Sequence, residues 1–327
     1  MFLDELLLLA REKGASDIHL QEGMIPALRV SGELFPIGDE EINTESLSRL
    51  LVVILDADGM DHFLRDGDAD TGYLSTDGIR ARISCYRSTG TTCMSIRVFP
   101  SVIPSMDSLR VPLSLQRLTS AAHGLVLVSG PTGSGKSTTL AAMIDAINKA
   151  RRLRIITIED PIEYIYTSQK AMVTQREVGK DCRDFLSGLR SALRQDPDVI
   201  LVGELRDRES VSTALMAAET GHLVFTTLHA GNVIEAVDRI AQYFPVSYQS
   251  EVRNQLANAL LGIAAQKLLP GKQGGRVAAF EILLPTPAIT NLIRRGTIHE
   301  IRNYMHASEG MQTFDDAMKE LRHFRFI

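Results

Sequence analysis

The stretch GPTGSGKST, residues 130–138, constrains the fold of this chain more than any other feature. It follows the apolar run LVLVS, which is typical of a buried strand, and it opens KSTTLAAMIDAINKA, whose pattern predicts a helix. The pattern G-x-x-x-x-G-K-[ST] between a strand and a helix is a phosphate-binding loop. Gly133 and Gly135 allow backbone torsions that other residues resist, so successive N–H groups can point at one anion. The loop therefore predicts an α/β domain that binds a nucleoside triphosphate.

The loop residues have distinct expected roles. The N-terminus of the following helix adds a partial positive charge. Lys136 can reach the outer phosphates, and the hydroxyl of Ser137 can ligate Mg²⁺. The residues predicted to bind the nucleotide are Gly130, Pro131, Thr132, Gly133, Ser134, Gly135, Lys136, Ser137 and Thr138, together with Glu159 and Asp160 further along the chain.

Two acidic clusters and two histidines lie at the ends of further predicted strands. IITIEDPIE supplies Glu159, Asp160 and Glu163, and DVILVGELRD ends an apolar strand at Glu204. Open α/β sheets bind ligands outside the carboxyl ends of their strands. Hydrolysis needs one carboxylate for the metal and one for water, and we predict that these clusters supply both.

The strand-like run HLVFTTLH is flanked by His222 and His229. A lone histidine is more often structural than catalytic. Because these two bracket one strand of the same predicted sheet, we expect both to sense the phosphates.

The pattern along the chain changes near residue 100. Residues 1–98 predict a small α+β unit, with a helix over 3–13 and strand-like pieces ALRVSGELFPI, ARISCYR and MSIRVF. Closely spaced prolines predict a linker over 99–112. In residues 113–327 the apolar runs GLVLVSG, RIITIED, DVILVGE and HLVFTTL are each expected to precede a helix. This alternation predicts a mostly parallel sheet.

Composition excludes several classes of protein. The 327 residues, 44% of them hydrophobic, suffice for two domains with real cores. A net charge of −5 does not suit a partner that is a phosphate polymer, so we expect no nucleic acid. The three cysteines form no CxxC pair, and MFLDELLLLAREKG lacks the basic region of a signal peptide. We therefore expect a cytoplasmic protein.

Seven stretches, in order along the chain, resemble the type II/IV secretion ATPases, and within them the PilT-like pilus-retraction ATPases. They cover nearly the whole chain and together are far more specific than the phosphate-binding loop alone. The stretches are GASDIHL, GPTGSGKST, TIEDPIEY, VTQREVG, LRQDPDVILVGELRD, TGHLVFTTLH and GMQTFDDA.

That resemblance implies a PAS-like N-terminal domain, a C-terminal RecA-like domain, and ATP between them in a ring-shaped homohexamer. It implies that Glu163 polarises the attacking water and that Glu204 belongs to the Walker B motif that serves Mg²⁺. It assigns His222 and His229 to a histidine box. Arg82 and Arg97 would act as arginine fingers, and a role as structural surface arginines is the alternative.

The implied function is mechanical. ATP hydrolysis acts on a platform protein at the inner face of the cytoplasmic membrane and withdraws pilin subunits from the filament, which produces twitching motility. One departure concerns the signature AIRNLIRE, which reads AITNLIRR at 288–295 with Thr290 and Arg295 as the changed residues. We expect this departure to affect coupling rather than hydrolysis.

Three other functions stay open. Pilus-assembly and type II secretion motors usually carry an extra N-terminal domain and a tetracysteine zinc insertion, which three cysteines cannot form. An accessory retraction paralogue could act as a nucleotide-gated scaffold, although the intact carboxylates argue against lost chemistry. A DNA-translocating RecA-fold motor lacks support from a basic strip.

Overall fold

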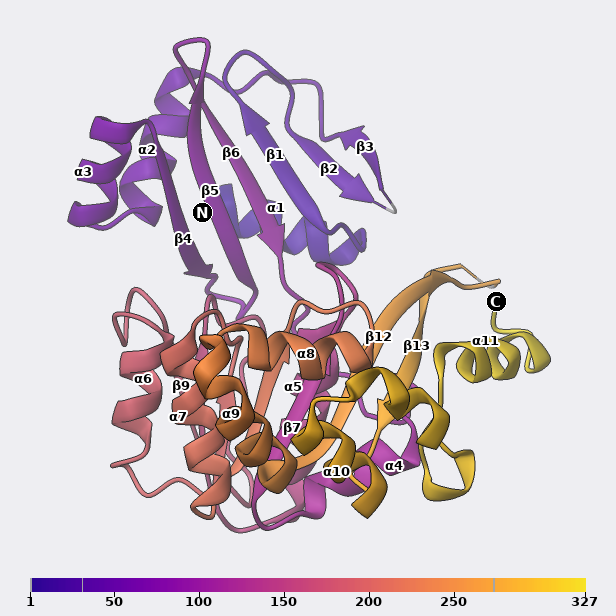
Figure 1. Cartoon of the computed structure of the whole chain (residues 1–327). Coiled ribbons are helices and arrows are strands. Elements are labelled where there is room, and N and C mark those ends of the chain that lie inside the picture. The colour runs from indigo at the N-terminus through magenta and orange to yellow at the C-terminus, as the bar shows by residue number, and fades with distance from the viewer. Residues whose placement is uncertain (1, 31, 273) are drawn as a thin grey trace. The chain divides into compact units, whose positions relative to one another are not determined.

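The computed structural model describes residues 2–30, 32–272 and 274–327, and the chain forms two compact units (Figure 1). The first unit contains Met1–Val102 and Glu163–Ile165, and the second contains Ile103–Ile162 and Tyr166–Ile327. Residues 103–112, which we expected in a linker, therefore belong to the second unit. Within the described ranges, no helix has both the length and the apolar character needed to cross a membrane.

The first unit is a six-stranded antiparallel sheet in the order β3-β2-β1-β6-β5-β4. The predicted helix over 3–13 is confirmed as α1, whereas ALRVSGELFPI forms two strands, with Ser31 between them outside the described residues. The elements are α1 (Phe2–Glu12), β1 (Asp17–Gln21), β2 (Ala27–Val30), β3 (Glu33–Pro36), α2 (Thr44–Ile54), α3 (Ala57–Asp66), β4 (Asp68–Leu74), β5 (Arg80–Ser88) and β6 (Thr91–Val98).

Alternation along the strands separates the two faces of this sheet. Ile18, Ile83 and Ile96 are fully buried and pack in one core with Leu7 of α1 and Leu47 of α2. Their chain neighbours point to the opposite face, because successive side chains of a strand alternate. Polar residues of β1, β5 and β6 occupy that second face.

The second unit is a seven-stranded sheet in the order β13-β12-β7-β11-β10-β8-β9. All neighbouring strands pair in parallel except β12 and β13, which form an antiparallel hairpin. The strands are β7 (Gly124–Ser129), β8 (Arg154–Glu159), β9 (Met172–Glu177), β10 (Val199–Val202), β11 (Leu223–Leu228), β12 (Leu260–Pro270) and β13 (Arg276–Leu283).

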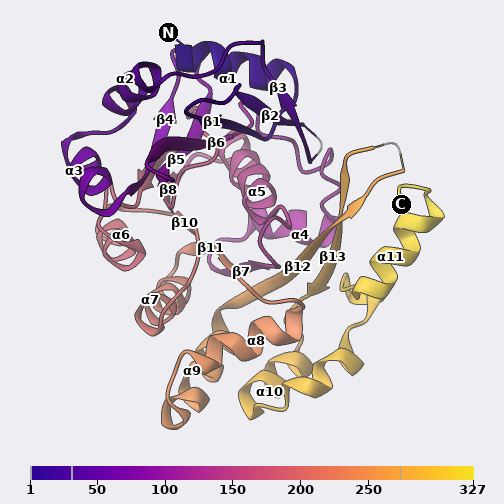
Figure 2. The same cartoon turned by 90° about the horizontal axis from the view of Figure 1, so that it is seen from above.

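Helices cover both faces of this sheet, with α5 on one side and α7, α8 and α9 on the other (Figure 2). The helices are α4 (Leu113–Gln116), η1 (Arg117–Ser120), α5 (Lys136–Ala150), α6 (Phe185–Ala192), α7 (Arg208–Glu219), α8 (Val233–Gln242), α9 (Val246–Ala259), α10 (Pro287–Arg295), η2 (Ile298–Tyr304), η3 (Ala307–Glu309) and α11 (Phe314–His323). Burial on both faces explains why β7, β10 and β11 are mainly apolar.

The four predicted strands are confirmed as β7, β8, β10 and β11. The expectation that a helix follows each of them is wrong for β8, which leads instead into the parallel edge strand β9. Side chains of β9 hold the connecting segment in an extended path. The backbone N–H of Tyr166 donates to Gln175 Oε1 at 2.8 Å, and that of Ile162 donates to Glu177 Oε2 at 3.1 Å.

The register of the parallel strands brings their carboxyl ends to one edge. Ser129 of β7 pairs with Leu228 of β11, and Val202 of β10 pairs with both Thr226 of β11 and Ile158 of β8. The ends of these four strands and the residues directly after them carry the predicted loop, Glu159 and Asp160, Glu204 and His229, whereas Glu163 belongs to the first unit. The fold therefore gathers the predicted chemistry at this edge.

Candidate active site

The phosphate-binding loop lies between β7 and α5, and its glycines are required by close contacts and torsions. Gly133 and Gly135 have φ values of +75° and +88°. A Cβ atom on Gly130 would lie 2.5 Å from both the carbonyl oxygen of Gln266 and the hydroxyl of Ser134. The loop therefore passes directly against β12 with no space for a side chain at Gly130.

The environment of the loop fits an anion. The Nζ of Lys136 donates to the carbonyl oxygens of Gly130 and Pro131 at 2.9 and 3.0 Å, which holds the ammonium group over the loop. Because Gly135 is the N-cap of α5, no N-cap side chain accepts from the first N–H groups of this helix. These donors and the helix dipole suit the phosphates of a nucleotide.

Buried hydroxyl groups near the loop point to the same ligand. Among the residues that the structure describes, the buried hydroxyls of Ser129, Ser134 and Thr226 make no hydrogen bond. Buried polar atoms in native proteins are nearly always satisfied, so each orphan group needs an explanation. Ser129 ends β7 and Ser134 lies in the loop, so a bound phosphate with its water shell would supply partners for these two hydroxyls, whereas Thr226 lies inside β11.

Gln266 packs against the phosphate-binding loop, and its role was not predicted from the sequence. It is buried on β12, and its Oε1 accepts from Thr139 Oγ1 at 2.8 Å. A Cβ on Gly135 would lie 2.8 Å from its Nε2 atom. The only signal in the sequence is the polar pair of Gln266 and Lys267 inside the otherwise apolar run GIAAQKLL.

Glu204 and His229, predicted independently, are brought together. The Nε2 atom of His229 lies 3.4 Å from Glu204 Oε2. The Glu204 carboxylate also accepts from Arg206, and this hydrogen bond raises the pKa of the guanidinium above its usual value. Arg206 Nη1 lies 3.7 Å from Asp160 Oδ2. Arg206, which sequence reasoning overlooked among the acids of GELRD, therefore links the two acidic clusters.

The first acidic cluster is held by residues of β8 and β9. Glu159 Oε1 accepts from Thr157 Oγ1 at 2.6 Å and from Gln175 Nε2 at 3.2 Å. Glu177, buried on β9, accepts from the backbone N–H of Ile162 and pairs with Lys180 Nζ at 3.1 Å. Glu177 thus fixes the backbone directly before Glu163. Its stretch VTQREVG contributed to the resemblance, but its role was not predicted.

The structure does not bring His222 to this edge. His222 precedes β11, its carbonyl oxygen accepts from the backbone N–H of Gly124 at 3.0 Å, and its Nδ1 lies 3.0 Å from the carbonyl oxygen of Ala217. The two histidines lie at opposite ends of β11, which separates them by about 20 Å at a rise of roughly 3.3 Å per residue. The prediction that both histidines serve one phosphate site is therefore wrong within a single chain.

Arg82 and Arg97 lie in the first unit, where they are directly opposite each other on β5 and β6. Each has a carboxylate partner. Arg82 Nη2 lies 3.3 Å from Asp70 Oδ2, and Arg97 Nε lies 3.1 Å from Asp17 Oδ1. The two guanidinium groups therefore share one face of the antiparallel sheet.

A cavity of about 320 Å³ adjoins the loop within the second unit. Its walls come from the start of α5, from residues 108–110 and from the β12–β13 hairpin. Arg110 is held there by its guanidinium, which stacks 3.7 Å above the ring of Phe326. Cavities of this size with a few polar groups typically hold small ligands. The lining residues are Ser108, Leu109, Arg110, Gly135, Thr138, Thr139, Gln266, Leu268, Arg276, Val277 and Ala278.

The site and the fold match a known family. Residues 1–273 match the family model described as "Type II/IV secretion system protein". The chain belongs to this family. It is 41% identical over 323 residues to the type IV pilus retraction ATPase PilT of Pseudomonas aeruginosa, covering 98% of this chain and 94% of PilT. It is 40% identical to a twitching motility protein of Neisseria gonorrhoeae, covering 90% of this chain and 80% of that protein.

A solved structure agrees with this assignment. The crystal structure of the pilus retraction motor PilT with bound ADP matches with a TM-score of 0.92 and 42% identity, covering 99% of this chain and 94% of that one. The predicted family and the mixed α/β fold with a RecA-like ATPase domain are therefore confirmed.

The role of Lys136 can be tested against a lysine on the same helix. Lys136→Ala removes the ammonium group at the loop, so we expect ATP hydrolysis to fall at least 100-fold, roughly the loss of a major phosphate contact. Lys149→Ala, which removes an exposed ammonium group that pairs with the buried Asp145 near the far end of the helix, is the control and should keep wild-type turnover. Equal turnover of the two variants would remove the phosphate-binding assignment.

Substitutions in the two acidic clusters should affect ATP binding and ATP hydrolysis differently. Glu163→Gln is a near-isostere that cannot act as a base, so we expect unchanged ATP affinity with hydrolysis reduced by about two orders of magnitude or more. Glu204→Ala should also lose hydrolysis, and in addition its ATP affinity should lose most of its dependence on Mg²⁺. Titration of ATP with and without Mg²⁺ measures the difference. Wild-type turnover of Glu163→Gln would show that the base lies on another strand.

Proposed function

We propose that this protein is an ATPase that powers the retraction of type IV pili as a homohexamer. The observation that carries the proposal is the phosphate-binding loop, Glu204 and His229 at one sheet edge, in a chain similar to PilT over nearly its whole length. The resemblance supplies the mechanical part of the proposal, and the geometry of the second unit supports the chemical part.

Nucleotide binding uses the loop and the adjoining cavity. Lys136 exchanges the carbonyl oxygens of Gly130 and Pro131 for the outer phosphates, while the N–H groups at the start of α5 donate to the inner ones. The nucleoside part of ATP occupies the cavity beside Arg110 and Gln266. Ser137 and Glu204 would hold Mg²⁺, which would supply charge neutralisation and orientation of the phosphates.

Hydrolysis requires that Glu204 changes partners. Arg206 now neutralises this carboxylate, and Arg206 also lies near Asp160, so it can move to the first acidic cluster without losing an acidic partner. Glu163 polarises the attacking water from the segment that Glu177 fixes. His229 lies against Glu204 and responds to its movement, which suits a residue that senses the γ-phosphate.

Arg82 and Arg97 complete the site as arginine fingers. Their side chains are 48% and 66% exposed, and each is held by one carboxylate. Release of Arg82 from the exposed Asp70 costs about 0–1 kcal/mol, and release of Arg97 from the largely covered Asp17 costs more. The first unit, which we take to be the PAS-like domain, carries both. Two mobile cations on one sheet face can neutralise the negative charge that develops during phosphoryl transfer.

The mechanical partners follow from the resemblance to PilT. The ring acts on a platform protein at the inner face of the cytoplasmic membrane, and through it on the pilin filament. Helix α10 carries the altered signature, with Ile289, Leu292 and Ile293 buried as their spacing predicts. Thr290 is anchored by its hydroxyl to the carbonyl oxygen of Thr286 at 3.0 Å. None of these residues lies at the nucleotide site, which supports a role in coupling.

The arginine fingers are tested by substitution with a control in the same unit. Arg82→Ala and Arg97→Ala should each lower kcat by about 10³-fold if they act as fingers, with little change in ATP affinity. Arg49→Ala removes an exposed arginine of α2 that pairs only along its own helix with Glu45, and it should leave kcat unchanged. Should all three variants match the wild type, Arg82 and Arg97 are structural.

The pilus function is tested by deleting the gene in its host. A retraction motor should leave cells with more surface pili and no twitching motility, because filaments form but are not withdrawn. The wild-type gene should restore motility, and Lys136→Ala should not. Loss of surface pili on deletion would instead identify an assembly motor, and unchanged pili and motility would leave only an accessory role.

A further inference from the structure

A fully buried carboxylate lies outside the nucleotide site. Glu281 of β13 is 0% exposed, and its Oε2 accepts from the backbone N–H of Val233, the first residue of α8, at 2.9 Å. Its Oε1 accepts from Arg302 Nη2 of η2 at 3.3 Å. A buried charge is stable only when it is paired and hydrogen-bonded. Glu281 meets this condition by joining the N-terminus of α8 to the segment that follows α10.

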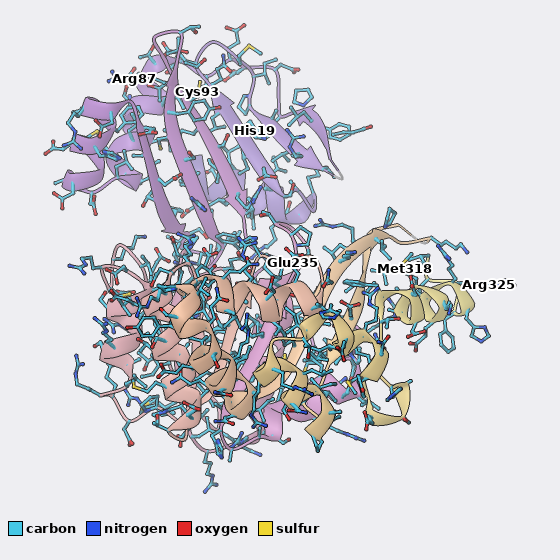
Figure 3. The ribbon with its side chains drawn as sticks, in the orientation of Figure 1. His19, Arg87, Cys93, Glu235, Met318 and Arg325 are labelled. Carbon is cyan, nitrogen blue, oxygen red and sulfur yellow. The ribbon has the colours of Figure 1, made fainter. Side chains whose placement is uncertain are left out.

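Helix α8 is in turn bonded to the active site. Arg239 of α8 donates from Nη1 to the carbonyl oxygen of His229 at 2.5 Å. Glu235, labelled on this helix in Figure 3, accepts from the backbone N–H of Gly231 at 2.7 Å and donates its own N–H to Asn232 Oδ1 at 2.9 Å. The segment from His229 to Val233 is therefore held to α8 along its whole length.

The far end of α8 also meets the active site. Tyr243, the residue that ends α8, donates its hydroxyl to the carbonyl oxygen of Leu205 at 3.0 Å. Leu205 directly follows Glu204. Arg239 and Tyr243 thus bond α8 to the backbone of His229 and to the residue after Glu204, the two side chains that lie 3.4 Å apart.

We propose that Glu281 and Arg302 are positioning residues that hold α8, and through it His229, at Glu204. The proposal rests on the ATPase function proposed above. Nucleotide binding depends on the loop between β7 and α5, which neither residue contacts, so breaking the pair slows hydrolysis without weakening binding. Because Arg302 follows α10, force on the C-terminal helices reaches the active site through this pair.

The test is a double-mutant cycle in which kcat is measured for Arg302→Ala, for His229→Ala and for the double variant. Removal of Arg302 leaves the fully buried Glu281 carboxylate without its cation, so folding of each variant is first checked by thermal unfolding. For folded Arg302→Ala we expect kcat to fall about tenfold while the Kd for ATP changes less than twofold. If Arg302 acts through His229, then Arg302→Ala has less than a twofold effect in the His229→Ala background. Arg302→Lys should restore part of the rate. Arg322→Ala, an exposed arginine of α11, is the control.

A second measurement does not depend on activity. Hydrogen exchange of the amides at 229–235 should speed up in Arg302→Ala and in Glu281→Gln, and should be unchanged in Arg322→Ala. Three outcomes would each overturn the positioning role. The first is that the effects of Arg302→Ala and His229→Ala on kcat multiply as independent effects do. The others are a loss of ATP affinity as large as the loss of kcat, and unchanged hydrogen exchange at 229–235. A wild-type protein without ATPase activity would contradict the proposed function, while the exchange measurement would still decide the role of the pair.

Discussion

Parallel pairing of β7, β11, β10 and β8 is the constraint on which the site depends. The residues that could bind and hydrolyse a nucleotide come from separate segments of the chain, and none is placed by its own local structure. In-register hydrogen bonding brings the carboxyl ends of these strands to one edge, as the pairs Ser129–Leu228 and Val202–Thr226 show. Each strand is buried on both faces. A shift of its pairing register would expose apolar side chains or leave them without packing partners, so such a shift is strongly disfavoured.

Ion pairs hold the charged side chains that are predicted for the site. Arg206 holds Glu204 and lies near Asp160, and in the first unit Arg82 and Arg97 are held by Asp70 and Asp17. Of the two pairs in the first unit, only Arg82–Asp70 is exposed on both sides, and such pairs contribute only about 0–1 kcal/mol. The carboxylates of Glu204 and Asp17 are 17% and 15% exposed, so water screens their pairs less and an exchange of their partners costs more.

The β12–β13 hairpin connects the nucleotide loop to the C-terminal helices. On β12, Gln266 accepts a hydrogen bond from Thr139 and leaves no space for a side chain at Gly135. On β13, the buried Glu281 accepts hydrogen bonds from the first residue of α8 and from Arg302. One rigid antiparallel hairpin thus carries the supports of both the loop and α8. A motor needs such a connection, because chemistry at a phosphate must be transmitted to surfaces that do not contact it.

The sequence by itself determined the features that depend on local order. Apolar runs placed β7, β8, β10 and β11, and the spacing of glycines, lysine and serine placed the loop, since both signals lie within a few neighbouring residues. Only the tertiary structure decided which groups meet. It joined Glu204 to His229 and Arg206, set Gln266 beneath the loop, and moved His222 to the opposite edge. Such contacts follow from strand order and register, which are set by packing between segments far apart in the chain and leave no local pattern.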